Sequence, residues 1–146
     1  MNNAGITLNA PFGEVTLEQF DTLYQVNIRA QFFLTQAALP ALAEHGKGIV
    51  INLTSVHAFL GMTEHSVYAG TKGAIVAYTR ELALELIQRG VRVNGIAPGW
   101  VFVENHRKVL GGSFDDIAAG KSLPAGFIGR ANDIGHLAVF LASDES

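Results

Sequence analysis

The 146-residue chain contains no cysteine, which excludes a disulfide scaffold and a thiolate metal site. It also has no apolar run approaching the ~20 residues that span a bilayer. Its ten Lys and Arg are scattered along a chain of net charge −3, so no basic stripe for nucleic acid is present. Residues 1–5 have neither the basic start nor the apolar core of a signal peptide. These absences predict a cytoplasmic protein with no metal and with neither nucleic-acid nor membrane partners.

The composition is that of a globular protein with a well-buried core. Hydrophobic residues make up 49% of the chain, and the mean hydropathy is +0.26. The length fits one domain, and the sequence contains no internal repeat, linker or low-complexity segment. We therefore treat residues 1–146 as a single domain.

Helical and strand patterns alternate along the chain. Thr16 and Gln19 have the spacing of a capping box at the start of the first helix. The patterns predict, in order, a helix over 17–44, a buried strand over 48–55, a helix over 66–89, a strand over 91–97 and a helix over 133–142. Residues 103–127 show only short helical patterns and are a candidate lid. This alternation predicts an α/β fold with a parallel sheet.

A tyrosine and a lysine lie four residues apart in the helix predicted over 66–89, in the stretch Tyr68-Ala-Gly-Thr-Lys72. Residues i and i+4 share one face of a helix, so a phenol and an ammonium can serve one site. A nearby cation stabilises phenolate, so we expect Lys72 to lower the pKa of Tyr68 from about 10 toward neutrality. Such a phenol suits general acid/base chemistry. The alternative is a surface pair with no chemistry.

Other polar residues follow the predicted strands. Ser55 lies at the carboxyl end of the strand over 48–55, where open α/β sheets bind ligands, although a simple strand-end cap is the alternative. The small, polar residues 2–5 suit close approach of backbone to a ligand, or an ordinary turn. His57 and His65 flank the expected pocket without metal-ligand spacing, and Trp100 suits packing or a pocket wall.

Five motifs occur in order at matching intervals, and together they resemble the short-chain dehydrogenase/reductase family over nearly the whole chain. The similarity is greatest to its 3-oxoacyl-carrier-protein reductase-like and glucose-dehydrogenase-like members. The motifs are Asn2-Asn3-Ala4-Gly5, the helix residue Asn27, Ser55 thirteen residues before Tyr68, Pro98-Gly99, and the tail Phe140-Leu-Ala-Ser-Asp-Glu-Ser146.

The resemblance implies a Rossmann-like parallel sheet with flanking helices, incomplete and covering the region of the family's strands four to six. It implies hydride transfer between NAD or NADP and a small secondary alcohol or ketone. The residues implied as catalytic are Asn27, Ser55, Tyr68 and Lys72; those implied in cofactor binding are Asn3, Ala4, Gly5, Tyr68, Lys72, Pro98, Gly99 and Val101; His57 and Trp100 are implied in the substrate pocket. It also implies a homodimer or homotetramer formed through the helices that carry Asn27 and Tyr68.

The chain departs from the family in three places. Val103 stands near the position of a Thr that contacts the nicotinamide amide, and Phe127 stands where many relatives have Arg. The family's opening strand and its T-G-x-x-x-G-x-G turn do not occur in these 146 residues. We therefore expect a truncated or mispredicted gene. A catalytically incompetent fragment and a self-associating non-enzymatic module are the alternatives. Reading the nucleotides upstream of Met1 for an in-frame Gly-rich turn separates these possibilities.

Overall fold

The computed structural model describes residues 1–103, 114–115 and 126–146. The chain divides into two compact units, Met1–Ala97 and Pro98–Ser146, and each is described by itself. A single partial domain over residues 1–146 stays a prediction. Within the described residues, no helix is both long and apolar enough to cross a membrane.

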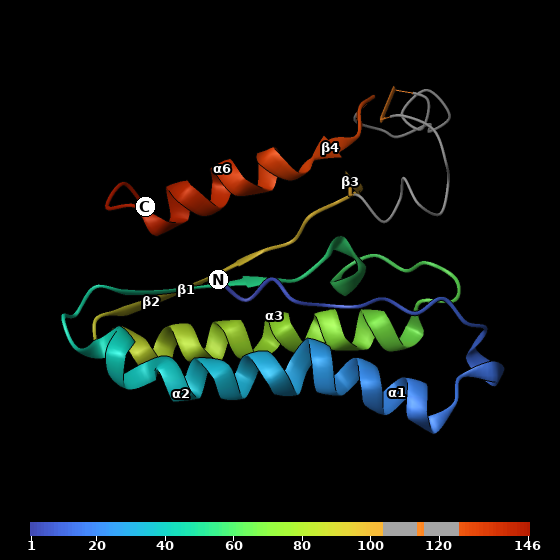
Figure 1. Ribbon diagram of the computed structural model, residues 1–146, viewed down its shortest axis with the longest axis horizontal. Helices are drawn as coiled ribbons and strands as arrows, with labels where there is room; N and C mark the ends of the chain where they lie inside the picture. Colours follow the sequence, from blue (N-terminus) through green and yellow to red (C-terminus); the bar gives the residue numbers. More distant parts are fainter. Residues whose placement is uncertain (104–113, 116–125) are drawn as a thin grey trace. The chain divides into compact units, whose positions relative to one another are not determined.

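The first unit alternates helices and strands, as the sequence predicts (Figure 1). Its elements are a 3₁₀ turn at Phe12–Glu14, α1 (Leu17–Tyr24), a π-helical segment at Gln25–Ala30, α2 (Gln31–Ala43), β1 (Gly48–Leu53), a 3₁₀ turn at Val56–Ala58, α3 (Ser66–Ile87) and β2 (Val91–Ile96).

The sheet of the first unit is parallel, which confirms the predicted fold class. β1 pairs with β2 in a register that runs from Gly48 opposite Val91 to Leu53 opposite Ile96. On the other edge of β1, Asn2 forms a parallel bridge with Asn52. The Asn2 N–H donates to the carbonyl of Ile51 at 2.8 Å, and the carbonyl of Asn2 accepts from Leu53 at 3.0 Å. Because all three segments run parallel, their carboxyl ends lie at the same end of the sheet.

The helices of this unit cover one side of its strands. α2 and α3 lie side by side on that side in Figure 1, with α2 against β1 and α3 against β2. The core between helices and strands is apolar, as expected for a buried parallel sheet. Its buried residues are Val50, Leu86, Val91 and Val93, and packed around them are Leu39, Leu42, Ala43, Leu82 and Ala83. The carboxyl ends of the strands are thereby fixed relative to α3.

The first predicted helix, over 17–44, is not one regular α-helix. It begins as predicted, because Thr16 Oγ1 accepts from the Gln19 N–H at 3.2 Å and Gln19 Oε1 accepts from the Thr16 N–H at 2.9 Å. Between α1 and α2, however, residues Gln25–Ala30 wind as a π-helix. This segment carries Asn27, whose buried side chain is bound by partners outside the helix. A local π-helical turn is a common way to aim such a side chain.

The second unit is small. A short β3 (Val101–Phe102) pairs in parallel with β4 (Gly129–Arg130), and α6 (Ala131–Ala142) follows directly. α6 begins two residues before the predicted start at 133, because the Asp133 carboxylate accepts from the Arg130 N–H at 2.7 Å and so caps the helix from its third position. Most of the candidate lid over 103–127 lies outside the described residues.

Candidate active site

Ser55 and Tyr68 meet just beyond the end of β1. Ser55 is the N-cap of the 3₁₀ turn at Val56–Ala58, and its hydroxyl accepts from the His57 N–H at 3.2 Å. Tyr68 is in the first turn of α3. The two side chains share a hydrogen bond, which acts to lower the pKa of Tyr68. The structure thus brings together two residues thirteen positions apart in the sequence.

The expected direction of the Tyr68 pKa shift was wrong. Burial of the phenol raises its pKa above the ordinary value, because desolvation disfavours the phenolate, and this outweighs the opposing effect of the Ser55 hydrogen bond. The ammonium group of Lys72 bonds to the backbone of β1 and forms no hydrogen bond with the Tyr68 phenol among the described residues. Its Nζ lies 5.6 Å from the centre of the Tyr68 ring and donates to the Leu53 carbonyl at 2.9 Å.

Lys72 is buried and joins α3 to β1. Besides the bond from its Nζ, its own carbonyl accepts from Thr54 Oγ1 at 2.9 Å. Burial lowers the pKa of Lys72 to about 8. An ammonium group has three N–H donors, so Lys72 can bind the Leu53 carbonyl and a hydroxyl of a ligand together.

Asn27 is fully buried and links the loop after Gly5 to α3. Its Oδ1 accepts from the Ile6 N–H at 2.8 Å, and its Nδ2 donates to the Ile6 carbonyl at 2.9 Å. Nδ2 also donates to Thr71 Oγ1 at 3.1 Å, and Thr71 Oγ1 in turn donates to the Tyr68 carbonyl at 2.7 Å. Sequence reasoning missed Thr71, because a residue 44 positions away in the chain gives no spacing signal.

The small residues after Asn2 run past these side chains. Asn3 and Ala4 are exposed. A Cβ at Gly5 would lie 3.4 Å from Asn27 Oδ1 and 3.6 Å from Lys72 Nζ. The backbone at Gly5 therefore passes beside the Lys72 ammonium.

Two histidines complete the surroundings of Tyr68. The rings of His57 and His65 stack with centroids 4.8 Å apart, and His57 meets the Tyr68 ring edge-on at 5.5 Å. Burial, together with the positive charge of His65, lowers the pKa of His57. His57 thus packs against Tyr68, and its place in a substrate pocket stays a prediction.

The other predicted site residues belong to the second unit. Val101 pairs with Gly129 in the β3–β4 ladder, and the carbonyl of Trp100 accepts from the Gly129 N–H at 3.0 Å. Pro98 and Gly99 follow β2 directly in the chain. Cofactor or substrate contacts of these four residues stay predictions. In the described parts of both units, no group of three or more His, Cys, Asp or Glu is placed to hold a metal ion.

The whole chain matches a known family, and similar proteins are enzymes. The family model described as enoyl-(acyl carrier protein) reductase matches residues 1–146. A gluconate 5-dehydrogenase from Gluconobacter oxydans is 35% identical over 147 residues, which cover 100% of this chain and 57% of that protein. The chain spans less than two thirds of the length of the curated relatives it matches.

The chain is also similar to solved structures, and it again covers only part of each of them. A putative NAD(P)-dependent gluconate 5-dehydrogenase from Beutenbergia cavernae, with bound NADP, has a TM-score of 0.87 at 38% identity, covering 99% of this chain and 58% of that one. A 4-hydroxyisoleucine dehydrogenase complexed with NADH has a TM-score of 0.82 at 28% identity, with 99% and 60% covered. The fold thus has counterparts among solved structures that bind NADP or NADH.

Proposed function

The chain belongs to the short-chain dehydrogenase/reductase family and has part of its Rossmann-like fold, and we propose that it interconverts a small secondary alcohol and the corresponding ketone. NAD or NADP is the proposed cofactor. The observation that carries the proposal is the hydrogen-bonded pair of Ser55 and Tyr68 at the carboxyl end of β1, with Lys72 buried beside it. Open α/β sheets bind their ligands at this edge.

In the proposed reaction, Tyr68 moves the proton. The nicotinamide supplies or accepts the hydride when it is bound. In ketone reduction the Tyr68 phenol donates its proton to the carbonyl oxygen, and in alcohol oxidation the phenolate accepts it. Because burial raises the pKa of Tyr68, the phenol stays protonated at neutral pH, which is the form that reduction requires. The Ser55 hydroxyl donates a hydrogen bond to the same substrate oxygen and stabilises the charge that develops there.

The remaining residues hold the cofactor and the geometry. Lys72 is proposed to bind the nicotinamide ribose hydroxyls through N–H donors other than the one that bonds the Leu53 carbonyl. Asn27 acts as a positioning residue, because its bonds to Ile6 and Thr71 fix the Gly5 loop against α3. Further contacts to the cofactor are proposed from Asn3, Ala4, Pro98, Gly99 and Val101.

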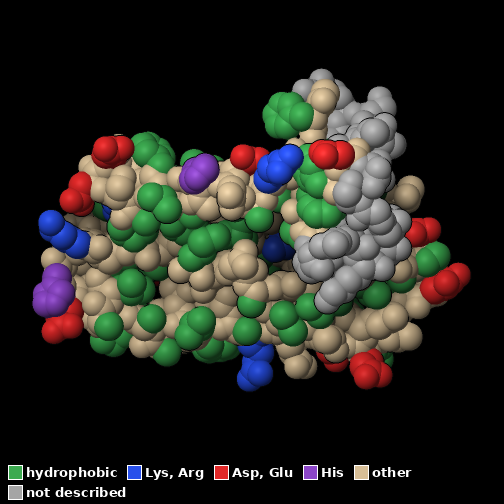
Figure 2. All heavy atoms as spheres, turned by 45° about the horizontal axis from the view of Figure 1, so that its top comes forward, with side chains coloured by type: hydrophobic (Ala, Val, Ile, Leu, Met, Phe, Trp, Pro, Cys, Tyr) green, Lys and Arg blue, Asp and Glu red, His purple; other side chains and the backbone are tan. Residues whose placement is uncertain are grey.

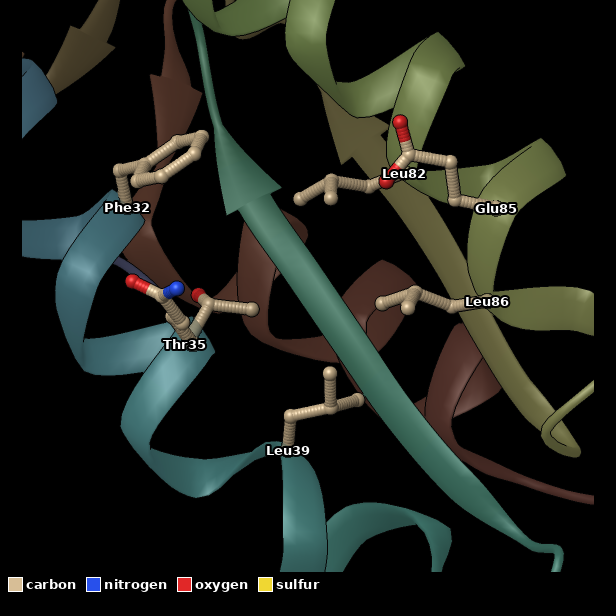
Figure 3. A pocket seen from close by; sticks show the side chains of 7 residues that line it. Phe32, Thr35, Leu39, Leu82, Glu85 and Leu86 are labelled. Carbon is tan, nitrogen blue, oxygen red and sulfur yellow. The ribbon is translucent and has the colours of Figure 1, made fainter.

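We also propose that the protein pairs with a second copy of itself through α2 and α3. A groove between these helices is lined by Phe32, Thr35, Gln36, Leu39, Leu82, Glu85 and Leu86 (Figure 3). Large apolar side chains lie exposed on both helices, and they include Phe33, Leu34, Leu84 and Ile87. Hydrophobic side chains are also spread over the face of the molecule that Figure 2 draws, interspersed with charged ones. Two copies of one apolar face are complementary by symmetry, so a homodimer, or a homotetramer built from it, buries this surface.

An activity assay separates the enzyme from a non-enzymatic module that only self-associates through this groove. The longest open reading frame containing the chain is expressed and supplied with NADH or NADPH and a panel of ketones. We expect cofactor oxidation that depends on both the ketone and the protein. An assembled, folded protein that turns over no ketone, oxidises no alcohol and binds neither cofactor would support the non-enzymatic module instead.

A further inference from the structure

Two imidazole rings stand beside Tyr68, and the chemistry described above uses neither. His57 and His65 stack at 4.8 Å with an angle of 29° between their planes. Each meets the Tyr68 ring edge-on, His57 at 5.5 Å and His65 at 6.3 Å. Both rings therefore pack against the side chain that is proposed to bond the substrate oxygen.

The hydrogen bond of His65 fixes which of its nitrogens carries the proton. Its Nδ1 lies 2.6 Å from the carbonyl oxygen of Thr63. A carbonyl oxygen only accepts hydrogen bonds, so Nδ1 is the donor in this contact. In the neutral ring, Nε2 of His65 is then an acceptor.

The surroundings of His57 favour the opposite tautomer. Its Nδ1 is buried and has no hydrogen-bond partner among the described residues. A buried N–H without an acceptor is rarer in proteins than a buried acceptor without a donor, so the proton belongs on Nε2. Burial, the larger cause, lowers the pKa of His57 below its ordinary value, so this ring is neutral at neutral pH. Nε2 of His57 is then a donor.

When the ring of His65 is uncharged, the two rings together offer one donor and one acceptor. A carboxylate group of a substrate only accepts hydrogen bonds and an ammonium group only donates them. Each could therefore bond to only one of the two histidines. A hydroxyl group both accepts and donates, and it needs no charge to be bound. We propose that His57 and His65 bind a second hydroxyl group of the substrate, so that the substrate is a polyol or the corresponding hydroxyketone. This inference rests on the proposed function.

The position of the second hydroxyl follows from the local chain. Ser55 and His57 belong to one 3₁₀ turn, and the Ser55 hydroxyl accepts from the His57 N–H. The residue that bonds the reacting oxygen and the residue that bonds the second hydroxyl are therefore fixed to each other within one turn. A substrate with hydroxyl groups on neighbouring carbons is therefore the first one to test.

The test compares two secondary alcohols that differ by one hydroxyl group, cyclohexanol and vicinal cyclohexanediol. The longest open reading frame containing the chain is assayed with its preferred nicotinamide cofactor. The ratio of kcat/KM for the diol to that for cyclohexanol is expected to be about tenfold or more in the unaltered protein, the value of one or two hydrogen bonds. In His57→Phe, which keeps a stacking ring and removes the N–H donor, the ratio is expected to fall to about one.

Further variants make the result specific. His57→Gln keeps a side-chain N–H donor and is expected to retain most of the diol preference. His65→Phe removes the acceptor and lowers the ratio independently, which covers the case in which His57→Phe does not fold. His45→Phe is the matched control, because His45 is exposed near the end of α2, and it leaves the ratio unchanged.

The outcomes distinguish this inference from the function on which it rests. If the unaltered protein oxidises neither alcohol and reduces no ketone, the proposed function fails and the substrate class fails with it. If it oxidises both alcohols but shows no preference for the diol, or if folded His57→Phe and His65→Phe keep the preference, only the role of the two histidines is overturned.

Discussion

The ammonium group of Lys72 donates to the carbonyl of Leu53 at 2.9 Å, and this bond fastens α3 to the last residue of β1. The carbonyl of Lys72 is held from the same segment by Thr54 Oγ1, also at 2.9 Å. Tyr68 lies one helical turn before Lys72, so the same two bonds set where its phenol stands relative to Ser55. Lys72 therefore positions Tyr68, the proposed proton donor. Its buried charge also makes the free energy of unfolding depend on pH.

Replacing Tyr68 by Phe is expected to lower kcat for ketone reduction by about 10²–10⁴-fold, the usual contribution of a general acid. The substitution keeps the ring, so the dissociation constant for NADH or NADPH should change little. Fluorescence titration measures the binding and steady-state kinetics measure the turnover. Tyr24→Phe is the control, since Tyr24 stacks on Phe20 in α1 and takes no part in the proposed site. Equal turnover in the two variants would remove Tyr68 from the role of proton donor.

Stability should rise with pH above about 8 because of Lys72. The pKa of Lys72 is about 8 in the folded protein and 10.5 for the ordinary group, so between these values the unfolded chain binds more protons than the folded one. The free energy of unfolding therefore increases with pH across this window. Urea unfolding at about pH 7 and about pH 9 measures the change while most tyrosines, with an ordinary pKa of about 10, are still protonated.

Lys72→Met is the matched variant for this measurement, because it keeps an unbranched chain and removes the titrating group. Its unfolding free energy should lack the rise that the unaltered protein shows. The same rise in both proteins would assign the effect to another group.

Asn27→Ala is expected to destabilise the first unit by about 2–4 kcal/mol, because it removes three hydrogen bonds and leaves a cavity where the fully buried Asn27 side chain stood. The lost bonds join Asn27 to the N–H and carbonyl of Ile6 and to the hydroxyl of Thr71. Thermal and urea unfolding measure the loss. Asn132→Ala, at an exposed position in the first turn of α6, should cost much less. Similar losses in the two variants would mean that Asn27 does not hold the loop after Gly5 to α3.

Phe32→Glu should convert the proposed homodimer or homotetramer into a smaller species, since it places a charge in the groove between α2 and α3. Phe32 is 39% exposed, so the substitution costs less within the subunit than across an apolar interface. Light scattering after size-exclusion chromatography measures the mass. Leu17→Glu is the control, because Leu17 is 84% exposed at the start of α1. An unaltered mass in Phe32→Glu would move the interface away from this groove.

The sequence by itself determined the order of the elements and the class of sheet. The strand at Gly48–Leu53 was predictable because its apolar, β-branched residues suit a strand that is buried on both faces. The start of α1 was predictable because Thr16 and Gln19 contact each other within one turn. The pair of Tyr68 and Lys72 was predictable from helical spacing, and the five motifs led to the family. The first three signals are local in the chain, and the motifs add only their order and spacing along it.

Only the tertiary structure decided how the site residues are held and charged. Asn27 forms hydrogen bonds with Ile6 and Thr71, which lie 21 and 44 positions away in the chain. These bonds go with the π-helical turn at Gln25–Ala30, which no periodicity in the sequence predicted. The pKa of Tyr68 rises because the folded chain removes water from the phenol, whereas the spacing to Lys72 alone suggested the opposite direction. Desolvation and long-range hydrogen bonds depend on which distant segments pack together, and that information is absent from any single stretch of sequence.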